Sequence, residues 1–162
     1  MTENIDLLNS SNNPFLLFKQ WFDEAKEYEI NDPNAMNLST ISKDSKPSSR
    51  MVLLKEYGDK GFVFYSNSRS KKGKSIYNNP YVSLNFHWKS LLRQVRIEGK
   101  VTKVSDEEAD KYYNSRPIES RIGAWASNQS EMLGKRKESQ TSLHKHKNSL
   151  NQVEKRHKKY LV

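Results

Sequence analysis

The chain has 162 residues, of which 34 % are hydrophobic and 29 % are charged, and its formal net charge at pH 7 is +9. This length fits one domain with its own core. There is no cysteine, which excludes disulfides and thiolate metal sites. The first residues lack the basic and apolar segments of a secretory signal, and no apolar run approaches the roughly 18 residues of a membrane span. We therefore expect a cytoplasmic protein without a membrane partner.

The positive charge is concentrated in the last part of the sequence. Residues 131–162 contain nine Lys or Arg against three Glu, and they show no clear apolar periodicity. We expect this segment to be a basic polar tail, helical or disordered. Residues 1–13 are rich in Asn and Ser and are expected to form a flexible arm. The folded domain is thus predicted to span residues 14–130.

The predicted elements begin with an amphipathic helix over residues 14–30. Phe15, Phe18, Phe22 and Ala25 recur at helical spacing behind Pro14. Apolar runs bounded by turn residues then predict strands over residues 35–42, 49–57, 62–66, 81–88 and 91–104. Short helices are predicted within residues 68–79 and over residues 105–115, and residues 118–130 are expected to hold a short helix or a loop. Five such strands with inserted helices predict a small antiparallel barrel.

Two cations flank an apolar run on the second predicted strand. Arg50 precedes residues 51–54, and Lys55 follows them. Five residues apart on a strand, the two side chains point to opposite faces, so one could hold a phosphate while the other reaches a different group. Both could equally be surface charges at the ends of a strand.

A second cluster follows the third strand, where a short helix is predicted to begin. Backbone N–H groups at a helix start, hydroxyl groups and lysines together suit a phosphate. A solvated basic loop is the alternative interpretation. The candidate residues are Tyr65, Ser66, Ser70, Lys71 and Lys72.

Three further segments carry polar groups that could bind a ligand. Gln94 lies in an otherwise alternating strand, where its amide could meet the edge of a heteroaromatic ring or simply face water. Tyr112 and Arg116 are four residues apart and share a helix face, and Ser120 follows the next turn, so the three could bind a second phosphate. Gln129 and Ser130 end the predicted domain. Three of the four histidines lie in the polar tail, and His144 and His146 lack nearby carboxylates, so no metal is expected.

The order and spacing of these segments resemble the pyridoxine/pyridoxamine 5′-phosphate oxidase family. The matching strings are residues 32–36 (DPNAM), 50–55 (RMVLLK), 61–67 (GFVFYSN), 78–80 (NNP), 93–95 (RQV), 115–117 (SRP), 120–127 (SRIGAWAS) and 129–130 (QS). The resemblance implies an FMN-binding split β-barrel, antiparallel and Greek-key-like, with flanking helices. It also implies a homodimer with FMN at the subunit interface.

The resemblance also assigns roles to the candidate residues. The FMN site of one subunit would be formed by Arg50, Lys55, Tyr65, Ser66, Ser70, Lys71, Lys72 and Gln94. Gln129 and Ser130 would reach FMN from the other subunit. The substrate phosphate would be held by Lys55, Tyr112, Arg116 and Ser120.

The implied reaction is the oxidation of pyridoxine or pyridoxamine 5′-phosphate to pyridoxal 5′-phosphate, with O2 as the acceptor and H2O2 as a product. FMN carries the difficult step, so no catalytic acid or base is assigned. Family members usually have Ser-Arg-Lys where this chain has Ser70-Lys71-Lys72, and lysine lacks the bidentate fork of arginine. They also continue with a Trp-containing strand and an Arg-x-His segment absent here, which predicts an exposed barrel edge and reduced turnover.

Two other functions fit parts of the pattern. A split-barrel flavin reductase-like protein with another substrate would share the first clusters but would not need Tyr112, Arg116 and Ser120. A non-enzymatic nucleic-acid binder could use the basic tail, but Tyr160 is the only aromatic residue there, so stacking on bases is poorly served.

Overall fold

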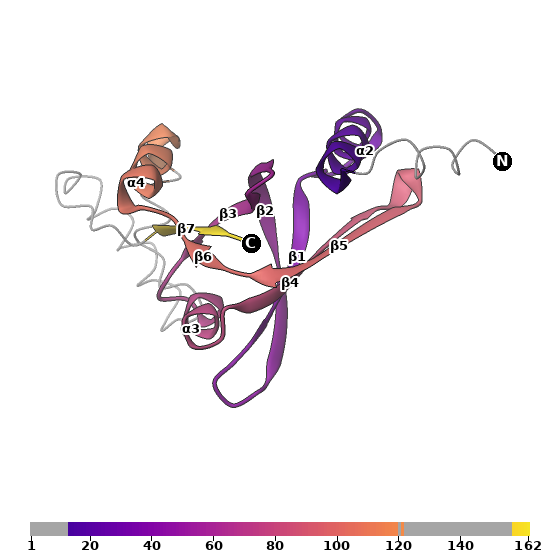
Figure 1. Ribbon diagram of the computed structural model, residues 1–162. Helices are drawn as coiled ribbons and strands as arrows, with labels where there is room; N and C mark the ends of the chain where they lie inside the picture. Colours follow the sequence, from indigo (N-terminus) through magenta and orange to yellow (C-terminus); the bar gives the residue numbers. More distant parts are fainter. Residues whose placement is uncertain (1–12, 120, 122–156) are drawn as a thin grey trace, which may run out of the picture.

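The computed structural model describes residues 13–119, 121 and 157–162 (Figure 1). In chain order these form helix α2 (Pro14–Tyr28), strands β1 (Ala35–Ile41), β2 (Pro47–Gly58) and β3 (Gly61–Asn67), helix α3 (Lys71–Asn78), strand β4 (Tyr81–Trp88), the 3-10 helix η1 (Lys89–Leu91), strands β5 (Arg93–Lys100) and β6 (Thr102–Lys103), helix α4 (Asp106–Ser115) and strand β7 (His157–Leu161). The helices predicted over residues 14–30, 68–79 and 105–115 and the first four predicted strands are confirmed to within three residues, and most of the segment 118–130 lies outside the described residues.

The strands form one curled antiparallel sheet in the order β5-β4-β1-β2-β3-β7-β6. Its two end strands, β5 and β6, are separated in the chain only by Val101. Val101 is buried, and its N–H donates to the Pro80 carbonyl at 2.8 Å. Because the two ends of the sheet are joined by a single residue, the sheet must close on itself as a barrel.

The barrel is split where β2 leaves β3. The first half of β2 pairs with β1, and only Leu54 to Gly58 pair with β3, after a bulge between Leu54 and Glu56. On its other edge, β3 pairs with β7 from Val63 to Asn67, whereas its residues beyond Phe64 have no partner in β2. β2 and the end of β3 therefore diverge, and their side chains border an opening. The predicted class, an antiparallel split barrel with flanking helices, is confirmed.

The core fills the barrel and the space beneath α2. Along β1, Met36, Leu38 and Thr40 point inward and are almost fully buried. Helix α2 places Phe18 and Phe22 against a cluster of aromatic rings. The ring of Phe18 packs on those of Phe22, Tyr57, Phe62, Phe86 and Trp88, with centroids 4.8 to 5.9 Å apart. Helix α2 is thus packed against the barrel core through apolar contacts, which makes this part of the structure rigid.

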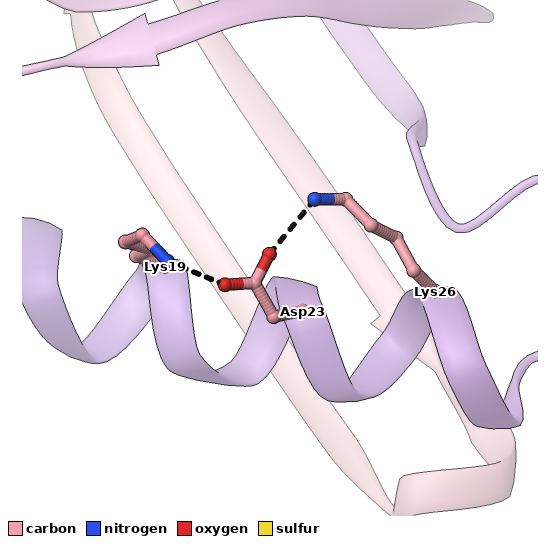
Figure 2. Close-up of polar contacts among 3 residues, drawn as sticks. All are labelled: Lys19, Asp23 and Lys26. Atoms are coloured by element: carbon pink, nitrogen blue, oxygen red, sulfur yellow. Dashed lines mark hydrogen bonds and ion pairs between the residues drawn. The ribbon is translucent and has the colours of Figure 1, made fainter.

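The outer face of α2 carries a small charge network. The Asp23 carboxylate accepts from the Lys19 ammonium at 2.6 Å and from the Lys26 ammonium at 2.8 Å (Figure 2). The two lysines lower the pKa of Asp23, mainly through these hydrogen bonds. All three groups are well exposed, so the network contributes little to stability. A separate ion pair between Glu24 and Arg93 ties α2 to β5.

Two predictions about the strands are wrong. Residues 91–104 do not form one strand, because η1 and Val101 divide them and β6 crosses to the opposite end of the sheet. The tail is not helical or disordered at residues 157–161, which form β7 between β3 and β6. The short sequence HKKYL has little apolar periodicity, and it becomes a strand because backbone partners lie on both sides. The edge of β3 is therefore covered rather than exposed. Within the described ranges, no helix is long and apolar enough to cross a membrane.

Candidate functional site

A cavity of about 470 Å³ lies at the split of the barrel. β2 and β3 supply two of its walls, Lys72 comes from α3, and α4 with the turn after it covers the remaining side. Six predicted site residues from four separate segments meet here: Lys55, Tyr65, Ser66, Lys72, Tyr112 and Arg116. The remaining lining residues are Met51, Val52, Leu53, Asn67 and Pro117.

The turn between β3 and α3 brings Lys72 to this cavity. Ser70 is the N-cap of α3: its hydroxyl accepts from the Gly73 N–H at 3.3 Å and donates to the Asn67 carbonyl at 2.7 Å. The Asn67 side chain accepts from the Arg69 N–H at 2.9 Å. Ser70 is fully buried and lies outside the lining of the cavity. Ser70 therefore stabilises the turn and the start of α3. The neighbouring Lys71 is exposed.

Ser66 presents a hydroxyl that the protein leaves unsatisfied. The side chain is only 4 % exposed, and its Oγ has no hydrogen-bond partner among the described residues. Leaving a buried hydroxyl unpaired costs about 1 to 3 kcal/mol. Because Ser66 lines the cavity, a ligand oxygen there would remove this cost.

Two cations, Lys72 and Arg50, lie close to each other. Lys72 is 8 % exposed and lines the cavity; burial, and then the charge of Arg50, lower its pKa. Arg50 lies outside the lining, and burial lowers its pKa as well. Lys72 is buried and Arg50 is half-buried, and their positive charges repel each other, so an anion bound near both would be favoured.

Two tyrosines and an arginine also line the cavity. The rings of Tyr65 and Tyr112 stack face to face, with centroids 3.5 Å apart and planes 10° from parallel. The Tyr65 hydroxyl donates to Glu56 at 3.3 Å. Arg116 follows α4 and is half-buried in the cavity wall. Tyr113 anchors this end of α4 by donating to the Arg121 carbonyl at 2.9 Å, and burial raises its pKa.

The structure does not bring every predicted residue to this cavity. Gln94 lines a separate hollow of about 370 Å³ with Asn85 and His87, and its amide donates to Asn85 Oδ1 at 2.9 Å. Ser120, Gln129 and Ser130 lie outside the described residues. Met51 and Leu53 were missed as lining residues, although the unbroken apolar run of residues 51–54 is a signal that both faces of the strand are covered.

Comparison with known proteins decides the family. Residues 22–145 match the family model described as pyridoxamine 5′-phosphate oxidase. The chain belongs to the pyridoxamine 5′-phosphate oxidase family. A relative from Pelagibacter ubique, named pyridoxine/pyridoxamine 5′-phosphate oxidase, is 55 % identical over 83 % of this chain and 64 % of its own length. A relative of the same name from Bradyrhizobium is 55 % identical over 76 % of this chain and 57 % of its own length. The chain thus matches about three fifths of these oxidases.

Solved structures share the fold of this oxidase-family chain. PhzG from Burkholderia lata, solved with tetrahydrophenazine-1-carboxylic acid, superposes with a TM-score of 0.88 at 24 % identity, covering 97 % of this chain and 79 % of PhzG. A pyridoxamine 5′-phosphate oxidase-related, FMN-binding protein from Nostoc punctiforme has a TM-score of 0.72 at 12 % identity, covering 94 % and 81 % of the two chains. At these identities the likeness shows the split-barrel fold alone.

Proposed function

We propose that the chain binds FMN and oxidises pyridoxine or pyridoxamine 5′-phosphate to pyridoxal 5′-phosphate, with O2 as the acceptor and H2O2 as a product. One observation carries this proposal: a single cavity gathers two sets of phosphate-binding groups from different elements. Lys72 and the unsatisfied Ser66 hydroxyl come from α3 and β3, and Tyr112 and Arg116 come from α4 and the turn after it. The family relationship supports the same reaction.

The residues present fit the phosphate of FMN. The Ser66 hydroxyl lacks a partner within the described part of the chain, and Lys72 and Arg50 add two positive charges beside it. Ser70 contributes by capping α3, and Lys71 adds a charge at the start of that helix. Gln129 and Ser130 are proposed to contact the flavin ring from the partner subunit, whereas Gln94 lines the separate hollow and has no role in this part of the proposal. The exposed apolar side chains of Met51 and Leu53 suit the face of that ring.

The second set of groups is proposed to hold the substrate. Lys55, Tyr112 and Arg116 offer an ammonium, a phenol and a guanidinium to its phosphate, and Ser120 is proposed to add a hydroxyl. A guanidinium can bind a phosphate with two parallel hydrogen bonds, which fixes the orientation of the substrate. These residues would then hold the reacting carbon against the cofactor.

FMN, when bound, supplies the acceptor for the hydride equivalent that leaves the carbon bearing the amine or alcohol. The alcohol gives the aldehyde directly, and the amine gives an imine that water hydrolyses to the aldehyde and ammonia. Both electrons would finally reach O2, which with two protons would give H2O2. The protein is proposed to contribute binding, orientation and the exclusion of water, and no acid or base is assigned.

A homodimer is part of this proposal. The outer face of β2 exposes 60 % of Met51 and 40 % of Leu53 beside the cavity. Apolar side chains exposed together at the rim of a polar cavity are typical of an interface or a ligand site. A second subunit placed over this face would bury them and bring Gln129 and Ser130 toward the flavin.

The test is an oxidase assay with pyridoxamine 5′-phosphate on wild type and on Arg116→Ala. We expect measurable turnover of the wild type in the presence of FMN. Arg116→Ala should raise KM at least tenfold because it removes a charged hydrogen bond to the substrate phosphate, while FMN affinity stays unchanged. Lys89→Ala, an exposed residue of η1, is the control.

The outcomes separate the alternatives. A wild type that binds FMN but does not oxidise either B6 phosphate would favour the flavin reductase-like function. A chain that takes up no FMN and binds nucleic acid would favour the basic binder and contradict the proposal.

A further inference from the structure

The guanidinium of Arg50 is held by an unusual number of acceptors from the β1–β2 pair. Its Nη1 donates to the Leu38 carbonyl at 3.0 Å and to Thr40 Oγ1 at 2.8 Å, and its Nη2 donates to Ser48 Oγ at 2.6 Å. Thr40 is 1 % exposed and lies opposite Ser48 in the strand register. An arginine held at three points has lost most of its rotamer freedom before any ligand arrives.

These three bonds leave part of the guanidinium available. Arginine has five N–H donors, and the bonds use both hydrogens of Nη1 and one of Nη2. The Nε–H and the second Nη2–H are not used by them. The Thr40 and Ser48 hydroxyls thus fix the plane of the group while two donors remain for an anion.

The position of Arg50 links this arrangement to the cavity. Arg50 shares the inward face of β2 with Val52, which lines the cavity, and its charge is the second cause that lowers the pKa of the lining residue Lys72. Thr40 itself lies outside the lining. Any effect of Thr40 on a ligand must therefore pass through Arg50.

We propose that Thr40 is a positioning residue for phosphate binding, because its buried hydroxyl, together with that of Ser48, fixes the Arg50 guanidinium beside Lys72 at the phosphate end of the cavity. The inference rests on the proposed FMN function and adds to it a residue that the sequence pattern did not mark. In the sequence, Thr40 is simply an inward position of β1 after Met36 and Leu38.

The test compares FMN with riboflavin, which has the same ring but no phosphate. Thr40→Val keeps the shape and the strand preference but removes the acceptor for Arg50. We expect it to weaken FMN binding about tenfold, the usual effect of losing a hydrogen bond to a charged group, and to leave riboflavin binding unchanged. Thr40→Ser should bind FMN like the wild type, because it keeps the hydroxyl. Thr102→Val, on the exposed strand β6, is the matched control.

A double-mutant cycle shows whether the effect passes through Arg50. In an Arg50→Met background, Thr40→Val should weaken FMN binding less than twofold further, because its target is gone. Full additivity of the two substitutions would overturn the inference.

The remaining outcomes separate a failure of this inference from a failure of the proposed function. Equal FMN affinity of Thr40→Val and the wild type, or a parallel loss of riboflavin binding, would overturn the inference and leave the proposed function intact. If the wild type itself takes up no FMN, the proposed function fails and the inference falls with it.

Discussion

At the scale of single residues, two side chains that line the cavity are buried at a cost in free energy. Ser66 keeps a buried hydroxyl without a partner in the described structure, and Lys72 keeps an ammonium in a buried place next to another cation. Such costs persist where a ligand compensates for them. The two residues therefore indicate where the proposed phosphate binds more specifically than the exposed lysines around the cavity do.

The lowered pKa of Lys72 predicts how FMN binding responds to pH. Burial and the charge of Arg50 favour the neutral amine, so Lys72 loses its proton at a lower pH than an ordinary lysine. The charged form binds phosphate, so FMN affinity should fall as pH rises through that lowered pKa. Fluorescence titrations from neutral to alkaline pH check this, with riboflavin correcting for ionisation of the ring.

The matched variant is Lys72→Arg, whose guanidinium stays charged over the whole range. Its FMN affinity should remain level where that of the wild type declines. Identical pH profiles for the two proteins would show that Lys72 does not carry the effect.

At the scale of elements, α3 is positioned by a close backbone approach. A Cβ placed on Gly73 would lie 2.4 Å from the Ser68 carbonyl oxygen and 2.7 Å from that of Asn67. These are backbone atoms of the turn that leads from β3 into α3, so they cannot move aside without displacing the helix. Glycine at this position allows the turn to present Ser66 and Lys72 to one cavity.

Gly73→Ala should therefore lower the free energy of unfolding by about 2 kcal/mol, as overpacking commonly does. It should also weaken FMN binding, because it displaces the start of α3. The control is Gly58→Ala, where an added Cβ meets nothing within 4 Å. Denaturant unfolding measures both variants, and equal stability of the two would contradict this view of the turn.

The strand β7 was not predicted from the sequence. Its backbone pairing can be tested separately. Tyr160 pairs with Phe64 on one side and with Lys103 on the other. Tyr160→Pro removes an N–H from a strand with neighbours on both edges, whereas Tyr160→Thr keeps it. The proline variant should be about 2 kcal/mol less stable than the threonine variant in thermal or denaturant unfolding. Equal stability would mean that β7 does not close the barrel.

At the scale of the whole molecule, the elements that could be predicted from the sequence are those with a clear local pattern of residues. Helix α2 follows from the spacing of Phe18, Phe22 and Ala25, and β4 from the alternation of residues 81–88. Lys55, Tyr65, Tyr112 and Arg116 were predicted as site residues, and they do share one cavity.

What the sequence could not predict depends on distant parts of the chain. β7 forms because β3 and β6 offer backbone partners. Ser70 was predicted as a ligand residue, but the turn geometry uses its hydroxyl as a cap. Arg50 is held by Thr40 and Ser48 through contacts that no periodicity reveals.

The proposed function requires the cavity at the split of the barrel to bind a flavin through its phosphate. A crystal structure of the chain grown with FMN tests it most directly. We predict phosphate oxygens at hydrogen-bond distance, about 3 Å, from Ser66 Oγ and Lys72 Nζ. A structure in which FMN lies elsewhere, or in which Ser66 and Lys72 make no contact with its phosphate, would contradict the account.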